Sequence, residues 1–280
     1  MSEQRRVPVG PRTLWAERIG RPDHPAVLLL AGAAMQATTW EQQFVGPFLD
    51  ADRSVVRFDW RDIGLASWAR FRELPYGIDD LAADAVAVLD AFHVNVADVV
   101  GFSMGGCIAQ LVALSACERV RSLTLLSSGF ASKIEVDRGE RGRQVFQLLT
   151  TPTPTDPGDQ IPRLVEQWRL LCGRSFPFET AEWEDRARSW VERGQNPSCP
   201  HMRLAPQIFS VDRTESLNRL EVPTFVLHGD DDPMFPLQHG LAFAETVPDA
   251  TINVYEGKGH DLHLDPHVAR SVVGALPCSP

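Results

Sequence analysis

The sequence predicts an α/β fold in which helices flank a mainly parallel central sheet and a helical segment interrupts the chain. Short runs rich in leucine and β-branched residues alternate with helical patterns through the first half, which is typical of β-α-β units. The alternation stops near residue 131 and returns after residue 215. We therefore expect residues 1–130 and 216–280 to form the core, and residues 131–215 to form a helical cap, or lid.

The expected strands are short apolar runs that lead into glycine-rich or polar segments. They span residues 26–30, 54–58, 98–100, 122–126, 224–227 and 251–255. One helix is expected over residues 78–92, where apolar side chains recur at helical spacing, and another begins at Met104 and ends near residue 116. Strands and helices alternate in this order until the insertion begins, which indicates parallel strands.

The composition argues against several classes of function. The 280 residues are 44% hydrophobic, enough for a large core, and their formal net charge of −10 is unfavourable for binding nucleic acid or an anionic membrane. The chain has no secretory pattern at its start and no apolar run near the roughly 20 residues of a membrane span. Its five cysteines lack the spacing of a zinc site. We expect a soluble cytoplasmic protein with no metal or cofactor, either monomer or homodimer.

Ser103 is the candidate nucleophile because Gly101-Phe-Ser-Met-Gly105 joins an expected buried strand to an expected helix. A match to G-x-S-x-G alone is close to chance, and its alternative is an ordinary serine in a glycine-rich turn. A nucleophile elbow requires this strand-to-helix setting, with glycine where a side chain would collide across the crossing. An oxyanion hole would then use the backbone N–H groups of Met104 and of Ala33, in the loop after residue 30.

A serine hydroxyl needs an adjacent base, and His260 is the candidate. It follows the last expected strand and is preceded by Gly259. His263 and His267 are the competing histidines. Both lie further along the chain, where we expect a helix and solvated side chains.

Asp232 is the candidate acid that fixes the tautomer of the His260 imidazole. It lies in a polar segment after the expected strand at residues 224–227, directly before Pro233 and furthest from the strand end. Asp230 and Asp231 remain alternatives for the same role. If Asp232 is the acid, they would cap the loop or be solvated.

Two further features carry less specific predictions. The segment Asp59-Trp-Arg-Asp-Ile-Gly64 follows an expected strand, and we interpret it as structural, with Arg61 paired to the two aspartates and Gly64 allowing a turn. The aromatic side chains of the insertion suit either a lid over an apolar pocket or the packing of its helices. They are Trp168, Trp183, Trp190, Phe176, Phe178 and Phe209.

Taken together, these segments resemble the α/β-hydrolases that include the anthracycline (aclacinomycin) methylesterases. The likeness runs through nearly the whole chain. The chain departs from the superfamily at Ala31, where most members have a histidine. The segments that carry it are Ala31-Gly-Ala33, the motif at residues 59–64, residues 75–90, Gly101-Phe-Ser-Met-Gly105, Trp168-Arg-Leu-Leu, Pro177-Phe, Asp232-Pro233 and Gly259-His260.

The resemblance implies an α/β-hydrolase fold and hydrolysis of a methyl ester on a small hydrophobic substrate, a polycyclic aromatic polyketide of antibiotic biosynthesis. It places the nucleophile, acid and base on Ser103, Asp232 and His260. A C–C bond hydrolase or a perhydrolase can use the same three residues and is the alternative within enzymes. A catalytically silent binding module is the alternative of another class, although such proteins usually lack a member of the triad.

Overall fold

An eight-stranded sheet forms the centre of the computed structural model, which describes residues 2–129, 136–210 and 212–277. The strand order is β1-β2-β4-β3-β5-β6-β7-β8, and every neighbouring pair from β4 to β8 is parallel. The strands are β1 (Ser2–Val9), β2 (Arg12–Ile19), β3 (Ala26–Leu30), β4 (Ser54–Asp59), β5 (Ala97–Phe102), β6 (Val120–Leu126), β7 (Thr224–Gly229) and β8 (Thr251–Tyr255). The predicted mainly parallel sheet is confirmed.

The antiparallel hairpin of β1 and β2 was absent from the sequence-based prediction. The two strands pair from Ser2 opposite Ile19 to Val9 opposite Arg12, and β2 then pairs antiparallel with β4. Most residues of β1 are exposed or half-buried, so its sequence is polar and lacks the apolar run that marks a buried strand. Edge strands of this kind are therefore the hardest to recognise from hydrophobicity alone.

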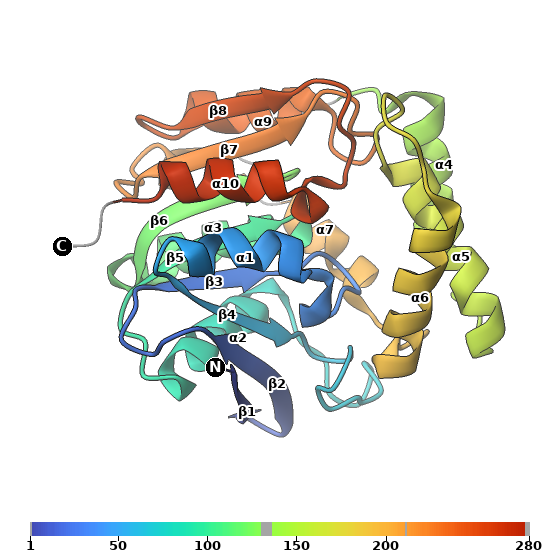
Figure 1. Cartoon of the computed structure of the whole chain (residues 1–280), viewed down its shortest axis with the longest axis horizontal. Coiled ribbons are helices and arrows are strands. Elements are labelled where there is room, and N and C mark those ends of the chain that lie inside the picture. The colour runs from blue at the N-terminus through green and yellow to red at the C-terminus, as the bar shows by residue number, and fades with distance from the viewer. Residues whose placement is uncertain (1, 130–135, 211, 278–280) are drawn as a thin grey trace.

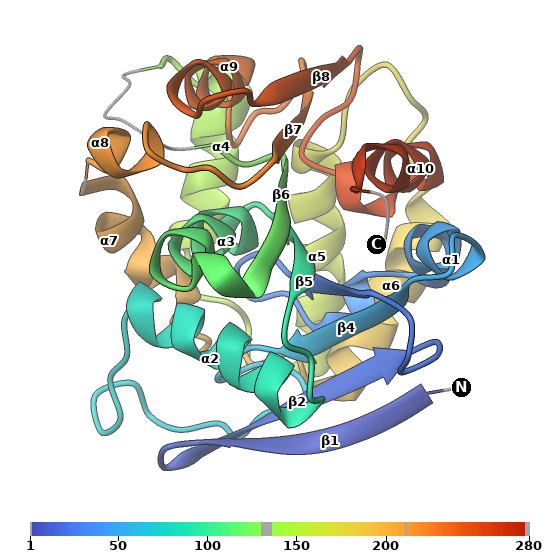
Figure 2. The ribbon, with the colours of Figure 1, turned by 90° about the vertical axis from the view of Figure 1, so that its left-hand side faces the viewer.

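Helices cover both faces of the sheet, as Figure 2 shows along the strand direction. On one face lie α1 (Gln42–Asp50) and α10 (Pro266–Ala275), and on the other lie α2 (Ile78–Ala91), α3 (Met104–Ser115) and α9 (Leu237–Thr246). Helix α2 begins and ends within one residue of its prediction, and its apolar stripe is buried against the sheet. Residues 27–30 of β3, in the middle of the sheet, are fully buried.

The insertion contributes α4 (Gly139–Thr150), α5 (Pro157–Leu171) and α6 (Thr180–Gly194), which we call the cap helices. Figure 1 shows them side by side at one end of the sheet. A short 3₁₀ segment (His201–Leu204), α7 (Ala205–Ser210) and α8 (Thr214–Leu217) lead back to β7. The predicted boundary at residues 130–131 lies outside the described residues, and the division into core and cap stays a prediction.

The loop at residues 59–64 is structural, but its ion pairs are not the ones predicted. Arg61 makes two hydrogen bonds, of 2.6 and 2.7 Å, to Asp84 of α2 instead of pairing with the aspartates beside it. Gly64 has φ +59°, consistent with the predicted turn. The two aspartates pair with arginines from distant elements, Asp59 with Arg193 and Asp62 with Arg12.

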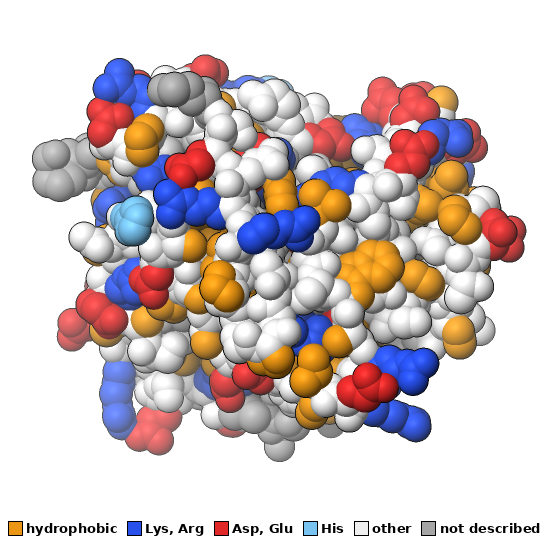
Figure 3. Space-filling model, turned by 90° about the horizontal axis from the view of Figure 1, so that it is seen from below, with side chains coloured by type: hydrophobic (Ala, Val, Ile, Leu, Met, Phe, Trp, Pro, Cys, Tyr) orange, Lys and Arg blue, Asp and Glu red, His pale blue; other side chains and the backbone are white. Residues whose placement is uncertain are grey.

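The surface carries no concentrated charge on the face seen in Figure 3, where acidic and basic side chains are interspersed and hydrophobic ones lie in small groups. Every helix in the described part of the chain is too short or too polar to cross a lipid bilayer. Four cysteines, Cys107, Cys117, Cys172 and Cys199, are free thiols. Cys278 lies outside the described residues.

Candidate active site

Ser103 occupies a sharp turn between β5 and α3. Its backbone has φ +54° and ψ −122°, a strained combination for a residue with a side chain, and its N–H donates to the Leu126 carbonyl oxygen at 3.0 Å. A Cβ on Gly101 would lie 2.5 Å from the carbonyl oxygen of Gly105, and one on Gly105 would lie 2.6 Å from that of Ala31. The glycines therefore allow the close crossing that projects Ser103, half-buried, from the end of the strand.

The structure brings Ser103, His260 and Asp232 into one chain of hydrogen bonds. Ser103 Oγ lies 2.9 Å from His260 Nε2, and His260 Nδ1 lies 2.8 Å from Asp232 Oδ2. Because a carboxylate only accepts, Nδ1 carries the proton and Nε2 is left as the acceptor for the serine hydroxyl. This is the tautomer in which histidine can act as a general base toward Ser103.

Asp232 is held in the orientation that this chain of hydrogen bonds requires. Its Oδ1 accepts from the backbone N–H groups of Met234 and Phe235, both at 2.8 Å. Burial alone would raise the pKa of Asp232, but the His260 and His228 imidazoles and the Phe235 N–H outweigh it and the pKa lies below its ordinary range. The carboxylate is therefore ionised at neutral pH.

The two neighbouring aspartates have other partners. Asp230 accepts from the backbone N–H of Gly257 at 2.6 Å, which ties the β7 loop to the β8 loop. Asp231 pairs with Arg141 at 3.0 Å and with Arg174 at 2.7 Å. In the described structure neither carboxylate forms a hydrogen bond with His260. Both carboxylates therefore connect neighbouring loops, consistent with the loop-capping role predicted for them.

The loop that carries His260 is attached to the cap helices. The His260 backbone N–H donates to the carbonyl oxygen of Leu171, the last residue of α5, at 2.7 Å. A Cβ on Gly259 would lie 2.6 Å from the carbonyl carbon of Cys172. His260 is thus positioned by the end of a cap helix as well as by β8.

His263 is not solvated, and that prediction is wrong. It lies in a 3₁₀ turn (Leu262–Leu264) before α10, is fully buried, and its ring centre is 4.1 Å from that of Phe102 and 5.3 Å from that of Trp168. Hydrophobic burial of this turn explains the error, because the residues that follow His260 turn back under the cap instead of entering the helix directly. His267 is exposed at the start of α10, as predicted.

The predicted oxyanion donors lie on the two segments expected of them. Met104 is the first residue of α3, and Ala33 lies in the loop after β3. Among the described residues, neither backbone N–H donates a hydrogen bond to a protein acceptor. Both donors are therefore unoccupied by protein partners, and their role as an oxyanion hole stays a prediction.

His201 holds the loop that contains Ala33, and nothing in the sequence pointed to it. The backbone N–H of Ala34 donates to His201 Nδ1 at 2.9 Å, so Nε2 carries the proton and donates to the Arg61 carbonyl oxygen, also at 2.9 Å. The ring is 1% exposed, and burial lowers its pKa to about 4. A neutral histidine from the end of the insertion therefore anchors Ala34, whose φ of +56° is itself strained.

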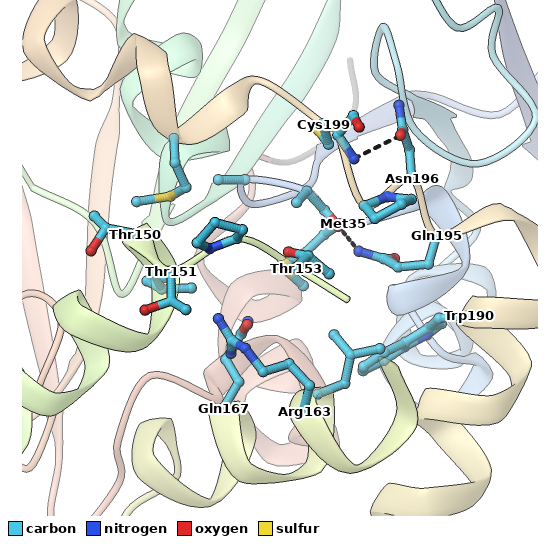
Figure 4. Close-up of a pocket in the computed structure, with 18 of the residues that line it drawn as sticks. Met35, Thr150, Thr151, Thr153, Arg163, Gln167, Trp190, Gln195, Asn196 and Cys199 are labelled. Atoms are coloured by element: carbon cyan, nitrogen blue, oxygen red, sulfur yellow. Dashed lines mark hydrogen bonds between the residues drawn. The ribbon is translucent and has the colours of Figure 1, made fainter. Parts of the chain in front are cut away.

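A cavity of about 570 Å³ lies between the cap helices and the loop at residues 33–35. Figure 4 shows Arg163 and Gln167 of α5 pointing into it, with Thr153 and Gln195 on other walls. Trp190 closes one side and the segment at residues 195–199 another. The cavity therefore adjoins the predicted oxyanion donor Ala33.

The three cap tryptophans pack together, and two of them, Trp168 and Trp190, also line this cavity. Trp168 stacks on Trp183 with ring centres 4.9 Å apart, and Phe178 also stacks on Trp183, at 5.5 Å. Trp168 and Trp190 are lining residues as well as core residues. Packing of the cap helices is therefore the role of these aromatics that the structure shows, and a lid over an apolar pocket stays a prediction. Phe176 is exposed, and the side chain of Phe209 lies outside the described part.

No group of three or more histidine, cysteine, aspartate or glutamate side chains suited to a metal ion is present in residues 2–129, 136–210 and 212–277. The groups that the site offers for chemistry are the serine, the imidazole, the carboxylate and backbone N–H donors. This set is suited to nucleophilic attack on a carbonyl group.

Comparison with known proteins agrees with this geometry. A family model described as "alpha/beta hydrolase fold" matches residues 25–266. Rhodomycin D methylesterase DauP of Streptomyces sp. (strain C5) is 36% identical over 275 residues, covering 91% of this chain and 91% of that protein. The 2-hydroxymuconate semialdehyde hydrolase of Pseudomonas sp. (strain CF600) is 30% identical, with 89% and 85% covered. The crystal structure of esterase RhEst1 from Rhodococcus sp. ECU1013 superposes with a TM-score of 0.77 at 21% identity, covering 98% of this chain and 99% of that one.

Proposed function

This chain belongs to the α/β-hydrolase fold family and is a carboxylic ester hydrolase, and we propose that its substrate is the methyl ester of a polycyclic aromatic polyketide. The observation that carries the proposal is the hydrogen-bonded chain from Ser103 through His260 to Asp232. The similarity to a rhodomycin D methylesterase over nine-tenths of both chains supports the substrate class. A cavity of about 570 Å³ with two tryptophans in its wall suits a flat ring system.

In the acylation step, Ser103 Oγ attacks the carbonyl carbon of the ester while His260 Nε2 takes the hydroxyl proton. The negative charge moves to the carbonyl oxygen, where the N–H groups of Ala33 and Met104 would stabilise it. When the tetrahedral intermediate collapses, the C–OMe bond breaks and the leaving oxygen takes the proton from His260. Methanol departs and the acyl group stays on Ser103.

In the deacylation step, water takes the place of methanol. His260 Nε2 removes one proton from the water as its oxygen attacks the acyl carbon, and the same proton is then given to Ser103 Oγ as the acyl bond breaks. The product is the free carboxylic acid and the serine is restored. Asp232 stays ionised throughout and stabilises the imidazolium that forms in each step.

The proposal is tested by offering the protein methyl esters of aromatic polyketides in water labelled with ¹⁸O and following the products by mass spectrometry. We expect loss of one CH₂ from the substrate and one ¹⁸O atom in the product acid. The Ser103→Ala variant should lose this turnover, and a fluorophosphonate probe should label the wild type but not the variant. Turnover that survives in Ser103→Ala would refute the assignment of the nucleophile.

A second candidate is a C–C bond hydrolase, which the similarity to a 2-hydroxymuconate semialdehyde hydrolase favours. Such an enzyme would consume a ring-fission product and leave the methyl esters intact. A purified protein that is labelled by fluorophosphonate but cleaves only the ring-fission substrate would replace the methylesterase proposal by this one. A folded protein that is not labelled at all would indicate a binding module.

A further inference from the structure

The cavity beside the oxyanion loop is positively charged, although the chain is acidic. Arg163 and Arg203 line it, and none of its described lining residues is aspartate or glutamate. The other polar lining groups are hydroxyls and side-chain amides. Since the sequence contains 37 acidic residues and 27 basic ones, this excess of positive charge is a property of the site and not of the composition.

Arg163 has no acidic partner among the described residues, unlike Arg186 and Arg193 of the cap helices. Arg186 pairs with Glu41 at 2.7 Å and Arg193 pairs with Asp59 at 2.8 Å. Arg163 forms no ion pair with a described carboxylate, and its hydrogen bond within the described structure runs from Nη2 to the carbonyl oxygen of Leu148. Its Nη1 is buried without a partner.

An unpaired, partly buried guanidinium is unfavourable unless something else satisfies it. The group has five N–H donors in a planar fork, and burial lowers the pKa of Arg163 with no neighbouring charge to oppose that effect. The free-energy cost of unpaired donors in a partly desolvated site is larger for a charged group than for a neutral one. A ligand oxygen in the cavity would satisfy the part of the guanidinium that lines the cavity, whereas the buried Nη1 lies out of its reach.

Arg163 is also placed where part of a substrate would lie. It precedes Gln167 by one helical turn on α5, and Figure 4 shows both side chains on the cavity side of that helix. The cavity extends to residues 33–35, the loop that carries the predicted oxyanion donor. Trp168, Trp190 and Arg163 line the same cavity as Ala33, so a ring system that extends from an ester at Ala33 into the cavity would meet these side chains. Neither Ser103 nor His260 is among the described lining residues.

We propose that this cavity is a subsite for an anionic or strongly accepting oxygen on the substrate's ring system, with Arg163 as the residue that selects it. The inference rests on the proposed function and deepens it. The matching chemistry is a phenolate or a hydroxyquinone, whose adjacent oxygens accept hydrogen bonds from a planar guanidinium in a fork. Arg163 and Arg203 would repel a substrate with a cationic group at this position, because no described lining residue is acidic and could offset their charge.

The test measures binding to the Ser103→Ala variant, so that it does not depend on turnover. Three probes share one ring system: anthraquinone-2-carboxylate, its neutral carboxamide, and an analogue carrying a quaternary ammonium group. Quenching of tryptophan fluorescence reports occupancy, because two of the seven tryptophans, Trp168 and Trp190, line the cavity. We expect the carboxylate to bind about 10- to 100-fold more tightly than the amide, the range of one charge-assisted hydrogen bond, and the cation to bind weakest.

Two added substitutions decide whether Arg163 is responsible. Arg163→Met should abolish the preference for the carboxylate, and Arg163→Lys should keep part of it because the charge remains without the fork. The matched control is Arg169→Met, on the same helix but exposed and outside the cavity lining, which should leave the preference unchanged.

Equal affinity for the three probes, or a carboxylate preference that persists in a folded Arg163→Met protein, would overturn the subsite. If Arg163→Met does not fold, the comparison of Arg163→Lys with Arg169→Met gives the same decision. Failure of the proposed function is a separate result, since the absence of methyl ester turnover is measured on the wild type by mass spectrometry.

Discussion

Replacing His201 with phenylalanine should reduce both the stability of the protein and its rate of catalysis. The imidazole accepts from the Ala34 N–H and donates to the Arg61 carbonyl oxygen, each at 2.9 Å, and it is almost fully buried. Phenylalanine fills a similar space but offers neither bond. Two backbone groups would then lie unpaired in a dry interior.

The size of the effect follows from those two groups. An unsatisfied buried donor or acceptor costs roughly 1–3 kcal/mol, so the substitution should lower the free energy of unfolding by about 2–6 kcal/mol, a large share of the roughly 5–15 kcal/mol typical of a domain. Release of Ala34 also frees Ala33, the predicted oxyanion donor. Since complete loss of one such donor costs on the order of 100- to 1,000-fold in kcat, a loosened one should cost about 10- to 100-fold.

Urea unfolding followed by tryptophan fluorescence measures the first effect, and kcat on a methyl ester measures the second. Two conservative variants separate the contacts: His201→Asn keeps an acceptor near the position of Nδ1, and His201→Gln keeps a donor near that of Nε2. We expect the asparagine variant to retain more of kcat, because it can still hold Ala34. A stability loss below about 1 kcal/mol in His201→Phe, or equal kcat in the asparagine and glutamine variants, would refute this reasoning.

The remaining predictions concern pH, the acid and the elbow. The pKa of His201 in the folded protein is about 4, below its ordinary value of 6.5. Its contribution to the free energy of unfolding is therefore full above pH 6.5 and falls by roughly 3 kcal/mol as the pH drops toward 4, at 1.36 kcal/mol per pKa unit. Parallel loss of stability by wild type and His201→Phe in a fluorescence-detected unfolding series would contradict this. Asp232→Asn should lower kcat by about 10⁴-fold with little change in KM. The amide oxygen would keep the N–H groups of Met234 and Phe235, so the NH₂ group would donate to His260 Nδ1 and hold the imidazole in the wrong tautomer. Steady-state kinetics with a circular dichroism check of folding tests it. Gly105→Ala should prevent folding or lower the free energy of unfolding by several kcal/mol, since its Cβ would press on backbone carbonyl oxygens. The control Gly274→Ala, at a position with open space around it, should be neutral or slightly stabilising; thermal melts of both variants test this.

The parts of the site that follow strand ends were predictable from the sequence. Ser103 directly follows a recognisable strand, and Asp232 and His260 lie in the loops that follow two others; parallel strands deliver such residues to one edge of the sheet. Local pattern therefore sufficed to nominate residues that the structure joins by hydrogen bonds. Choosing among Asp230, Asp231 and Asp232 was harder, since a shift of one residue changes which carboxylate faces the imidazole.

The parts that depend on contacts between distant segments were not predictable. His201 and Arg163 lie in the helical insertion, where the local pattern does not reveal their partners. The role of His201 depends on its contact with Ala34, and that of Arg163 depends on the cavity that its side chain lines. The predicted partners of Arg61 were wrong for the same reason. Its actual partner, Asp84, lies on a helix that only the fold brings near. A hydrogen-bond partner is a property of three-dimensional neighbours, which single-sequence reasoning does not supply.

The bond from the His260 N–H to the Leu171 carbonyl oxygen has a consequence for protein engineering. Exchanging the cap of a hydrolase for that of a relative is an obvious way to alter its substrate range. Here the last turn of α5 supports His260. Arg141 of α4 and Arg174, just after α5, both pair with Asp231, which is next to Asp232 in the chain. A graft must therefore keep the junctions at residues 141 and 171–174, or the chimera will bind new ligands without turning them over.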